Sequence, residues 1–227
     1  MTDKLRAGRL IAIEGIDASG KSSVANEIVA TLARRGVRSL LVSRRTVPLL
    51  STGYVRDHLR ELASLIWEYP QDAHTTELGL WHWTKLLGAW YCAVDYAVVR
   101  PALSDGATVV ADSWIYKYIA RFALEMDMAK AFECFANIST PHRVVWLDIA
   151  PSVCAARRAH TRATERGEWI SGLGGQDSFV EYQGRVRAVY GNLAESGTWQ
   201  IVTSLDAPMA LAERISIGLV KSGTATS

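Results

Sequence analysis

The feature that most constrains this chain is a short glycine-rich segment near its N-terminus. An apolar run at residues 10–13 leads into residues 15–22, which follow the spacing Gly-x-x-x-x-Gly-Lys-Ser, and a helical pattern begins directly afterwards. Glycines at this spacing let successive backbone N–H groups turn onto phosphate oxygens, at the positive end of the next helix. An ordinary glycine-rich turn can show the same spacing, but the strand before and the helix after favour a P-loop that binds a nucleoside triphosphate.

Residues within this loop have separate expected roles. Lys21 would reach the β- and γ-phosphates of the donor, and the Ser22 hydroxyl would bind Mg²⁺. We expect the donor to be ATP. The residues expected to hold it are Gly15, Asp17, Ala18, Ser19, Gly20, Lys21, Ser22 and Ser23.

Short apolar runs alternate with helical patterns along the chain. The expected strands are residues 10–13, 40–43, 108–111, 144–149 and 201–203, and the expected helices are residues 22–35, 75–103, 129–137, 151–166, 177–195 and 208–220. This alternation predicts an α/β fold of the P-loop NTPase type, with three α/β/α layers, a five-stranded parallel sheet and a helical lid. No linker divides the chain, so we expect residues 1–227 to form one domain with a disordered tail at about 221–227.

Composition excludes several classes of partner. With 25 basic and 23 acidic residues, the net charge of +2 gives no electrostatic case for nucleic acid or for an anionic membrane. Cys92, Cys134 and Cys154 are scattered without the spacing of a zinc site or a disulfide framework, which indicates free thiols in a reducing compartment. The N-terminus has no signal-peptide pattern, and no apolar run reaches membrane-spanning length, so we expect a cytoplasmic protein.

Arginines cluster before a glycine-rich segment. Arg158, Arg162 and Arg166 are spaced i, i+4, i+8 and would share one helix face. Such a stripe can be a solvated basic surface. Because it leads into a glycine-rich flap, we favour a lid at about 155–176 that brings Arg158 and Arg162 to the transferring phosphate as catalytic residues.

Charged residues also follow two of the expected strands. Asp112 ends the third apolar run. A carboxylate at this position can hold Mg²⁺ together with Ser22. Alternatively, Asp112 could only cap the strand. Arg44 and Arg45 follow the second run and suit an anionic phosphate acceptor. They could equally be two exposed loop arginines.

The long helical pattern at residues 75–103 is rich in aromatic residues. Trp81, Trp83, Trp90 and Tyr91 recur at helical spacing, which favours core packing or a subunit contact over base stacking. This apolar helix predicts a homodimer. Asp95 is its polar exception and a candidate acceptor ligand.

These segments together resemble the thymidylate kinase family of P-loop nucleoside monophosphate kinases. Residues 14–22 are similar to that family's first loop, residues 147–151 with Arg157 and Arg158 to its fourth strand and lid entry, and residues 185–194 to the helix after the lid. The resemblance implies that Asp17 faces the acceptor sugar and that Arg45, or Arg44 in a shifted register, holds the acceptor monophosphate. It also implies a homodimer.

Departures from the family pattern fall on the acceptor side. The family has Asp-Arg-aromatic after its third strand, whereas this chain has Asp112, Ser113 and Trp114. Lys117, Arg121 and Phe122 stand where the family places Ser and a Tyr-Gln pair, and Tyr91 is nearest to an expected base-reading arginine. We therefore expect an intact donor half and a rebuilt acceptor half that keeps its positive charge in new places.

The leading hypothesis is a phosphotransferase that moves the γ-phosphoryl group of ATP, with Mg²⁺, to a nucleoside monophosphate or a related small anionic acceptor. The expected acceptor-binding residues are Asp17, Arg44, Arg45, Tyr91, Asp95, Ser113, Trp114, Lys117 and Arg121. One alternative is a kinase of a non-nucleotide metabolite on the same fold. Another is a nucleotide-binding regulatory protein without transfer activity.

Overall fold

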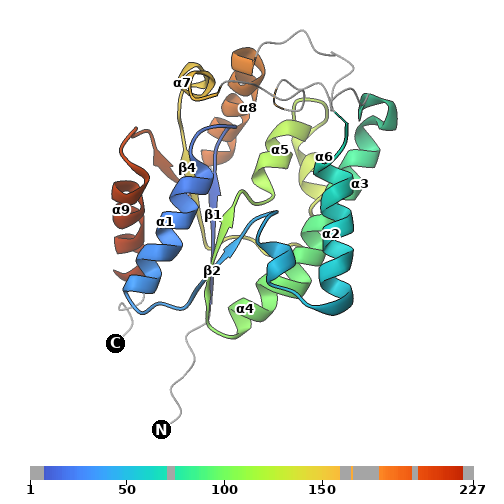
Figure 1. Ribbon diagram of the computed structural model, residues 1–227. Coiled ribbons are helices and arrows are strands. Elements are labelled where there is room, and N and C mark those ends of the chain that lie inside the picture. The colour runs from blue at the N-terminus through green and yellow to red at the C-terminus, as the bar shows by residue number, and fades with distance from the viewer. Residues whose placement is uncertain (1–7, 71–74, 159–164, 166–178, 196–198, 222–227) are drawn as a thin grey trace.

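A single parallel sheet forms the centre of the molecule. The computed structural model describes residues 8–70, 75–158, 165, 179–195 and 199–221 (Figure 1). Within these residues, five strands pair in the order β2-β3-β1-β4-β5, all parallel. Their bounds are β1 (Arg9–Glu14), β2 (Ser39–Val42), β3 (Thr108–Asp112), β4 (Arg143–Leu147) and β5 (Trp199–Val202). The predicted α/β class and five-stranded parallel sheet are confirmed.

The central strand is apolar throughout because helices cover both of its faces. Leu10, Ile11, Ala12 and Ile13 of β1 are almost fully buried, so no polar residue alternates with them. In the register of the sheet, Ile13 pairs with Asp112 of β3. The carboxyl ends of neighbouring strands therefore lie together at one edge, where the glycine-rich loop leaves β1.

Helices form the outer two layers. On one face, α1 (Lys21–Arg34) and α9 (Pro208–Lys221) lie side by side (Figure 1). Aromatic contacts join α5 (Tyr116–Phe122) and α8 (Phe179–Ala194) to the sheet. Tyr116 of α5 packs edge-on against Trp199 of β5, and Tyr190 of α8 stacks on Trp146 of β4. The other helices are α2 (Gly53–Trp67), α3 (Gly79–Val94), α4 (Arg100–Ser104), α6 (Met128–Glu133) and α7 (Pro151–Ala156), with short 3₁₀ turns at Val47–Leu49 and Thr75–Leu78.

The predicted helix at 75–103 is a composite run. After the 3₁₀ turn and α3, a π-helical turn at Asp95–Val99 leads into α4. Pro101 lies in the first turn of α4 and has no N–H to donate to the preceding turn. A widened turn before a proline lets the chain stay helical.

Two helices were not predicted. In α2, Val55, Leu59, Leu62 and Ile66 recur at intervals of four, three and four residues, so a helical signal was present in the sequence. With seven residues, α5 is too short for periodicity to reveal it. The predicted helix at 129–137 is also shorter than expected, since α6 ends at Glu133.

The predicted lid at about 155–176 lies outside the described residues except for 155–158 and 165, and the predicted tail lies outside them from residue 222 onward. Within the part of the chain that the structure describes, no helix is long and apolar enough to cross a membrane.

Candidate active site

The glycine-rich loop runs from the end of β1 to the start of α1. Gly15 and Gly20 have φ values of +146° and +100°, which residues with a Cβ atom rarely adopt. A Cβ on Gly15 would lie 2.8 Å from the Leu147 carbonyl oxygen and 2.8 Å from Ser19 Oγ. The loop geometry therefore requires glycine at position 15 for space as well as for conformation.

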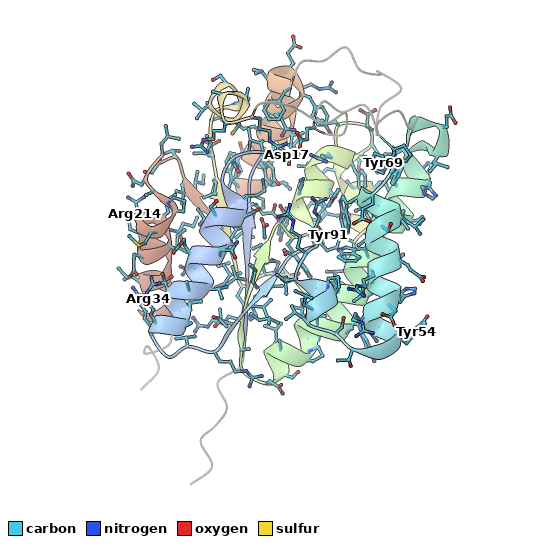
Figure 2. All side chains as sticks on the ribbon, viewed as in Figure 1. Asp17, Arg34, Tyr54, Tyr69, Tyr91 and Arg214 are labelled. Carbon is cyan, nitrogen blue, oxygen red and sulfur yellow. The ribbon has the colours of Figure 1, made fainter. Side chains whose placement is uncertain are left out.

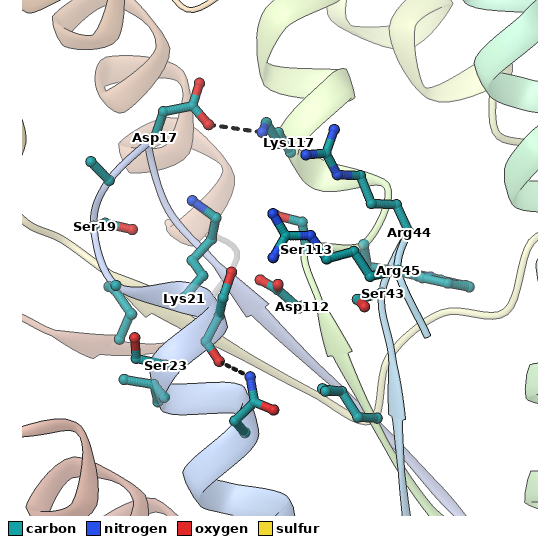
Figure 3. Close-up of a pocket in the computed structure, with 18 of the residues that line it drawn as sticks. Asp17, Ser19, Lys21, Ser23, Ser43, Arg44, Arg45, Asp112, Ser113 and Lys117 are labelled. Atoms are coloured by element: carbon teal, nitrogen blue, oxygen red, sulfur yellow. Dashed lines mark hydrogen bonds and ion pairs between the residues drawn. The ribbon is translucent and has the colours of Figure 1, made fainter. Parts of the chain in front are cut away.

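Lys21 begins α1 and turns back toward the loop. Its Nζ donates a hydrogen bond of 2.5 Å to the Ile16 carbonyl oxygen. Burial, together with the positive charge of Lys117, lowers the pKa of Lys21 to about 8, although nearby carboxylates oppose the shift. Figure 3 shows the side chain pointing into the cavity beside the loop. A bound polyphosphate would give this buried cation the counter-charge that favours its protonated form.

A cavity of about 970 Å³ opens at the carboxyl edge of the sheet. Figure 2 shows Asp17 at this end of the molecule. Most of the residues predicted for the site line the cavity: Asp17, Ala18, Ser19, Gly20, Lys21, Ser22, Ser23, Arg44, Arg45, Tyr91, Asp112, Ser113, Trp114, Lys117, Arg121 and Arg158. The fold thus brings together loop, strand-end and helix residues that are more than 100 positions apart in the chain.

Asp112 and Ser22 both line this cavity. Asp112 ends β3 and lies to the right of Lys21 in Figure 3. Among the described residues, no group of three or more acidic, histidine or cysteine side chains could hold a metal ion. Mg²⁺ in proteins is commonly held by one or two carboxylates together with phosphate oxygens and water. One carboxylate and one hydroxyl therefore fit a magnesium ion that arrives with a nucleotide.

Asp17 lies at the centre of a buried charge network. Lys117 Nζ lies 2.8 Å from Asp17 Oδ1, and Arg121 pairs with Oδ2. The amide of Gln183 donates to Oδ2 at 3.2 Å and accepts the backbone N–H of Asp17 at 3.1 Å. Burial alone would raise the pKa of Asp17, but the charges of Lys117 and Arg121 hold it well below its usual range.

Arg44 and Arg45 face this network from the loop after β2. Both arginines extend toward Lys117, Asp112 and Ser113 in Figure 3. The guanidinium of Arg44 lies 5.9 Å from the ring centroid of Trp67. Together with Lys117 they form a cationic group at the cavity, which we call the cation cluster.

Ser113 is held in a strained conformation at the end of β3. Its φ is +64°, in the left-handed region, and its N–H donates to the Ile13 carbonyl oxygen at 3.1 Å. Its buried hydroxyl has no hydrogen-bond partner within the described residues. Strain of this kind costs of order 1–3 kcal/mol and is concentrated at functional sites.

Two residues predicted to bind the acceptor have hydrogen-bond partners within the fold, and of the two only Trp114 lines the cavity. Asp95 does not line the cavity. Its carboxylate accepts hydrogen bonds from Arg100 Nε at 2.8 Å and from the Ser139 N–H at 3.1 Å. The Trp114 ring is fully buried, and its Nε1 donates to the Ser139 carbonyl oxygen at 2.9 Å. Tyr91 lies in the cavity wall and packs edge-on against Trp114.

The start of the predicted lid contacts the phosphate loop. Arg157 Nη1 donates to the carbonyl oxygens of Ala18 and Ser19 at 3.2 and 3.3 Å. Arg158, predicted to be catalytic, pairs at 2.5 Å with both oxygens of Glu165. Arg162 lies outside the described residues.

Sequence reasoning missed two residues of this region. Gln183 is fully buried and joins the Asp17 carboxylate to the Glu165 carbonyl oxygen, with hydrogen bonds of 3.2 and 2.8 Å. Glu14 is fully buried beneath the loop and accepts from the Trp114 N–H at 2.8 Å. No motif marks a lone glutamine or glutamate whose partners lie 100 or more residues away.

A Gly-x-x-x-x-Gly-Lys-Ser loop at the carboxyl edge of a parallel sheet, opening onto a cation-lined cavity, is typical of P-loop proteins that bind a nucleoside triphosphate. Comparison with known proteins narrows this class. The chain is 29% identical over 209 residues to a thymidylate kinase of Alteromonas mediterranea (89% of this chain, 84% of that protein), and 28% identical over 230 residues to one from a Synechococcus strain (94% and 96%). A thymidylate kinase of Arabidopsis thaliana is 27% identical over 219 residues (92% and 69%). No protein-family model matches the chain.

The chain is thus similar to thymidylate kinases along most of its length. It is an enzyme of the nucleoside monophosphate kinase kind.

Proposed function

We propose that the enzyme transfers the γ-phosphoryl group of ATP, with Mg²⁺, to a nucleoside monophosphate or a related small anionic acceptor. The observation that carries this proposal is the cation cluster of Arg44, Arg45 and Lys117, which faces Lys21 of the phosphate loop across one cavity. Two anions, the donor polyphosphate and an acceptor phosphate, would be held on opposite sides of that space. Phosphoryl transfer needs positioning and positive charge more than covalent chemistry.

Each side of the site contributes separately to the transfer. On the donor side, the loop N–H groups and Lys21 hold the phosphates, and Ser22 and Asp112 would hold Mg²⁺, which neutralises charge on the transferring group when it is bound. Arg157 and Arg158, which both line the cavity, would add positive charge beside the donor. On the acceptor side, the cation cluster orients the acceptor oxygen in line with the γ-phosphate.

Similarity to thymidylate kinases along most of the chain favours an enzyme over the non-catalytic alternative. A non-nucleotide acceptor stays a second candidate, because Ser113, Lys117 and Arg121 differ from the family pattern on the acceptor side.

Incubation with labelled ATP and a panel of acceptors tests the proposal. The panel holds thymidylate, other nucleoside monophosphates, nucleosides and hydroxylated metabolites. We expect label on a monophosphate, and we expect Lys21→Ala to abolish turnover while melting within a few degrees of the wild type. Label on a non-phosphorylated metabolite would favour the second candidate, and near-normal activity of Lys21→Ala would contradict the assignment.

We also propose that the protein acts as a homodimer in the cytoplasm. Exposed Leu78, Trp81 and Tyr96 on the helical run that contains α3 support self-association, and three free cysteines support a reducing compartment.

A further inference from the structure

Trp67, the last residue of α2, lines the cavity beside the cation cluster. The Arg44 guanidinium lies 5.9 Å from the centre of its ring, within the range of a cation–π contact. Arg45 is also exposed, but among the described residues its side chain has no hydrogen bond, ion pair or ring contact. The two neighbouring arginines therefore differ, because the fold supports only one of them.

The Trp67 ring is itself fixed from two directions. Its Nε1 donates a hydrogen bond of 3.1 Å to the Tyr118 hydroxyl, and Trp90 packs edge-on against it with the ring centres 5.0 Å apart. Tyr118 is 5% exposed and follows Lys117 in α5. The ring thus gives Arg44 a fixed support at the side of the cavity where Lys117 lies.

The charge of Arg44 also acts on Tyr118. Burial raises the pKa of Tyr118, and the positive charges of Arg121 and Arg44 are among the effects that lower it. In Figure 3, Arg44 extends toward Lys117. A guanidinium that stacks on a ring keeps its in-plane N–H donors for a phosphate. Arg44 and Lys117 can therefore bind one anion together.

We propose that Trp67 is a positioning residue, which holds Arg44 beside Lys117 for the acceptor phosphate, and that Arg44 contributes more than Arg45 to binding this phosphate. The inference rests on the proposed function and assigns separate roles within the cation cluster. An arginine that is already held loses less conformational entropy when a ligand binds. Arg45 has to be ordered at that moment, so its contribution is smaller.

A double-mutant cycle tests the inference. In the presence of Mg²⁺ and a non-hydrolysable ATP analogue, calorimetry would give the Kd of thymidine, cytidine, adenosine and guanosine 5′-monophosphates. We expect Trp67→Leu to raise the Kd of the monophosphates that bind by about three- to tenfold. In an Arg44→Ala background the same change should have almost no further effect, whereas in an Arg45→Ala background its full effect should remain.

Two further variants separate the ring contact from a general effect on α2. Trp67→Phe keeps a ring against Arg44 and should retain most of the affinity. Tyr54→Leu removes an 80% exposed ring from the other end of the helix, and this matched control should bind as the wild type does. Circular dichroism checks that each variant folds. Arg44→Ala and Arg45→Ala change exposed side chains, so they test the ranking of the arginines even if Trp67→Leu does not fold.

We expect Arg44→Ala to weaken monophosphate binding at least about threefold more than Arg45→Ala does. Equal losses would overturn the inference, and so would wild-type binding by a folded Trp67→Leu enzyme. A full effect of Trp67→Leu in the Arg44→Ala background would also overturn it, because the ring would then act on the acceptor directly. If none of the four monophosphates binds or accepts phosphate from ATP, the proposed function itself fails, which is a distinct result.

Discussion

Glu14 is a carboxyl group buried at the end of β1, directly beneath the phosphate loop. It accepts hydrogen bonds from the Trp114 N–H at 2.8 Å and from the Tyr190 hydroxyl at 2.9 Å. Burial raises its pKa to about 7, against the opposing effects of these hydrogen bonds and of Lys21. This single group therefore couples the stability of the loop region to pH.

Replacing this carboxyl group by an amide should remove that pH dependence. Between the ordinary pKa of 4.5 and the raised value of about 7, the native state binds more protons than the unfolded state, so Glu14 lowers stability as pH rises through this window. In Glu14→Gln, the amide oxygen still accepts from Trp114. The wild type should lose stability between pH 5 and pH 8, whereas the variant should not. We therefore expect the difference in unfolding free energy, variant minus wild type, to increase by about 1–3 kcal/mol from pH 5 to pH 8.

Chemical denaturation across this pH range measures the effect. Glu61→Gln, at an exposed glutamate of α2, is the control and should follow the wild-type profile. Parallel profiles for Glu14→Gln and the wild type would contradict the role of this buried carboxyl group.

At the scale of helices, two glycines in similar secondary structure have opposite surroundings. Gly88 of α3 is buried, and a Cβ built there would lie 2.8 Å from the carbonyl oxygen of Cys134, just after α6. Gly184 of α8 has no such neighbour within 4 Å. The close approach of α3 to the end of α6 therefore depends on the missing side chain at position 88.

Alanine at the two positions should change stability in opposite directions. We expect Gly88→Ala to destabilise the protein by about 1–3 kcal/mol, because the neighbouring backbone must move. Gly184→Ala should stabilise it by about 0.5–1 kcal/mol, since alanine loses less conformational entropy in a helix. Urea denaturation measures the stability of both variants. Equal changes in the free energy of unfolding would show that the close approach of α3 to the end of α6 does not depend on Gly88.

Elements with a strong local pattern were predictable from the sequence. The five strands were found because buried parallel strands are continuous apolar runs, as in Thr108–Asp112. By contrast, the turn at Asp95–Val99 depends on how a proline is accommodated within packed helices. The partners of Asp95, one of them a backbone group 44 residues away, could not be read from helical spacing.

At the scale of the whole molecule, exposed apolar side chains bear on self-association. Trp81 is 57% exposed and Tyr96 is 75% exposed, on the run that contains α3. Burying such aromatic surfaces between two subunits would favour a dimer.

We expect sedimentation equilibrium to give about twice the chain mass of 24.9 kDa, and the double variant Trp81→Glu, Tyr96→Glu to shift the protein toward monomer. Met209→Glu, at an exposed position of α9, serves as the control and should stay dimeric. A wild type that sediments as a monomer at micromolar concentration would contradict the proposed dimer.

The sequence by itself determined the phosphate loop and the parallel sheet around it. In both cases the decisive interactions are local: two glycines and a lysine within one turn, or a run of apolar residues within one strand. Only the tertiary structure decided which groups surround Asp17. Its partners Lys117 and Gln183 lie 100 and 166 residues further along the chain, and they reach it because β1, α5 and α8 converge at the carboxyl edge of the sheet. Which groups meet a buried carboxylate therefore depends on that convergence.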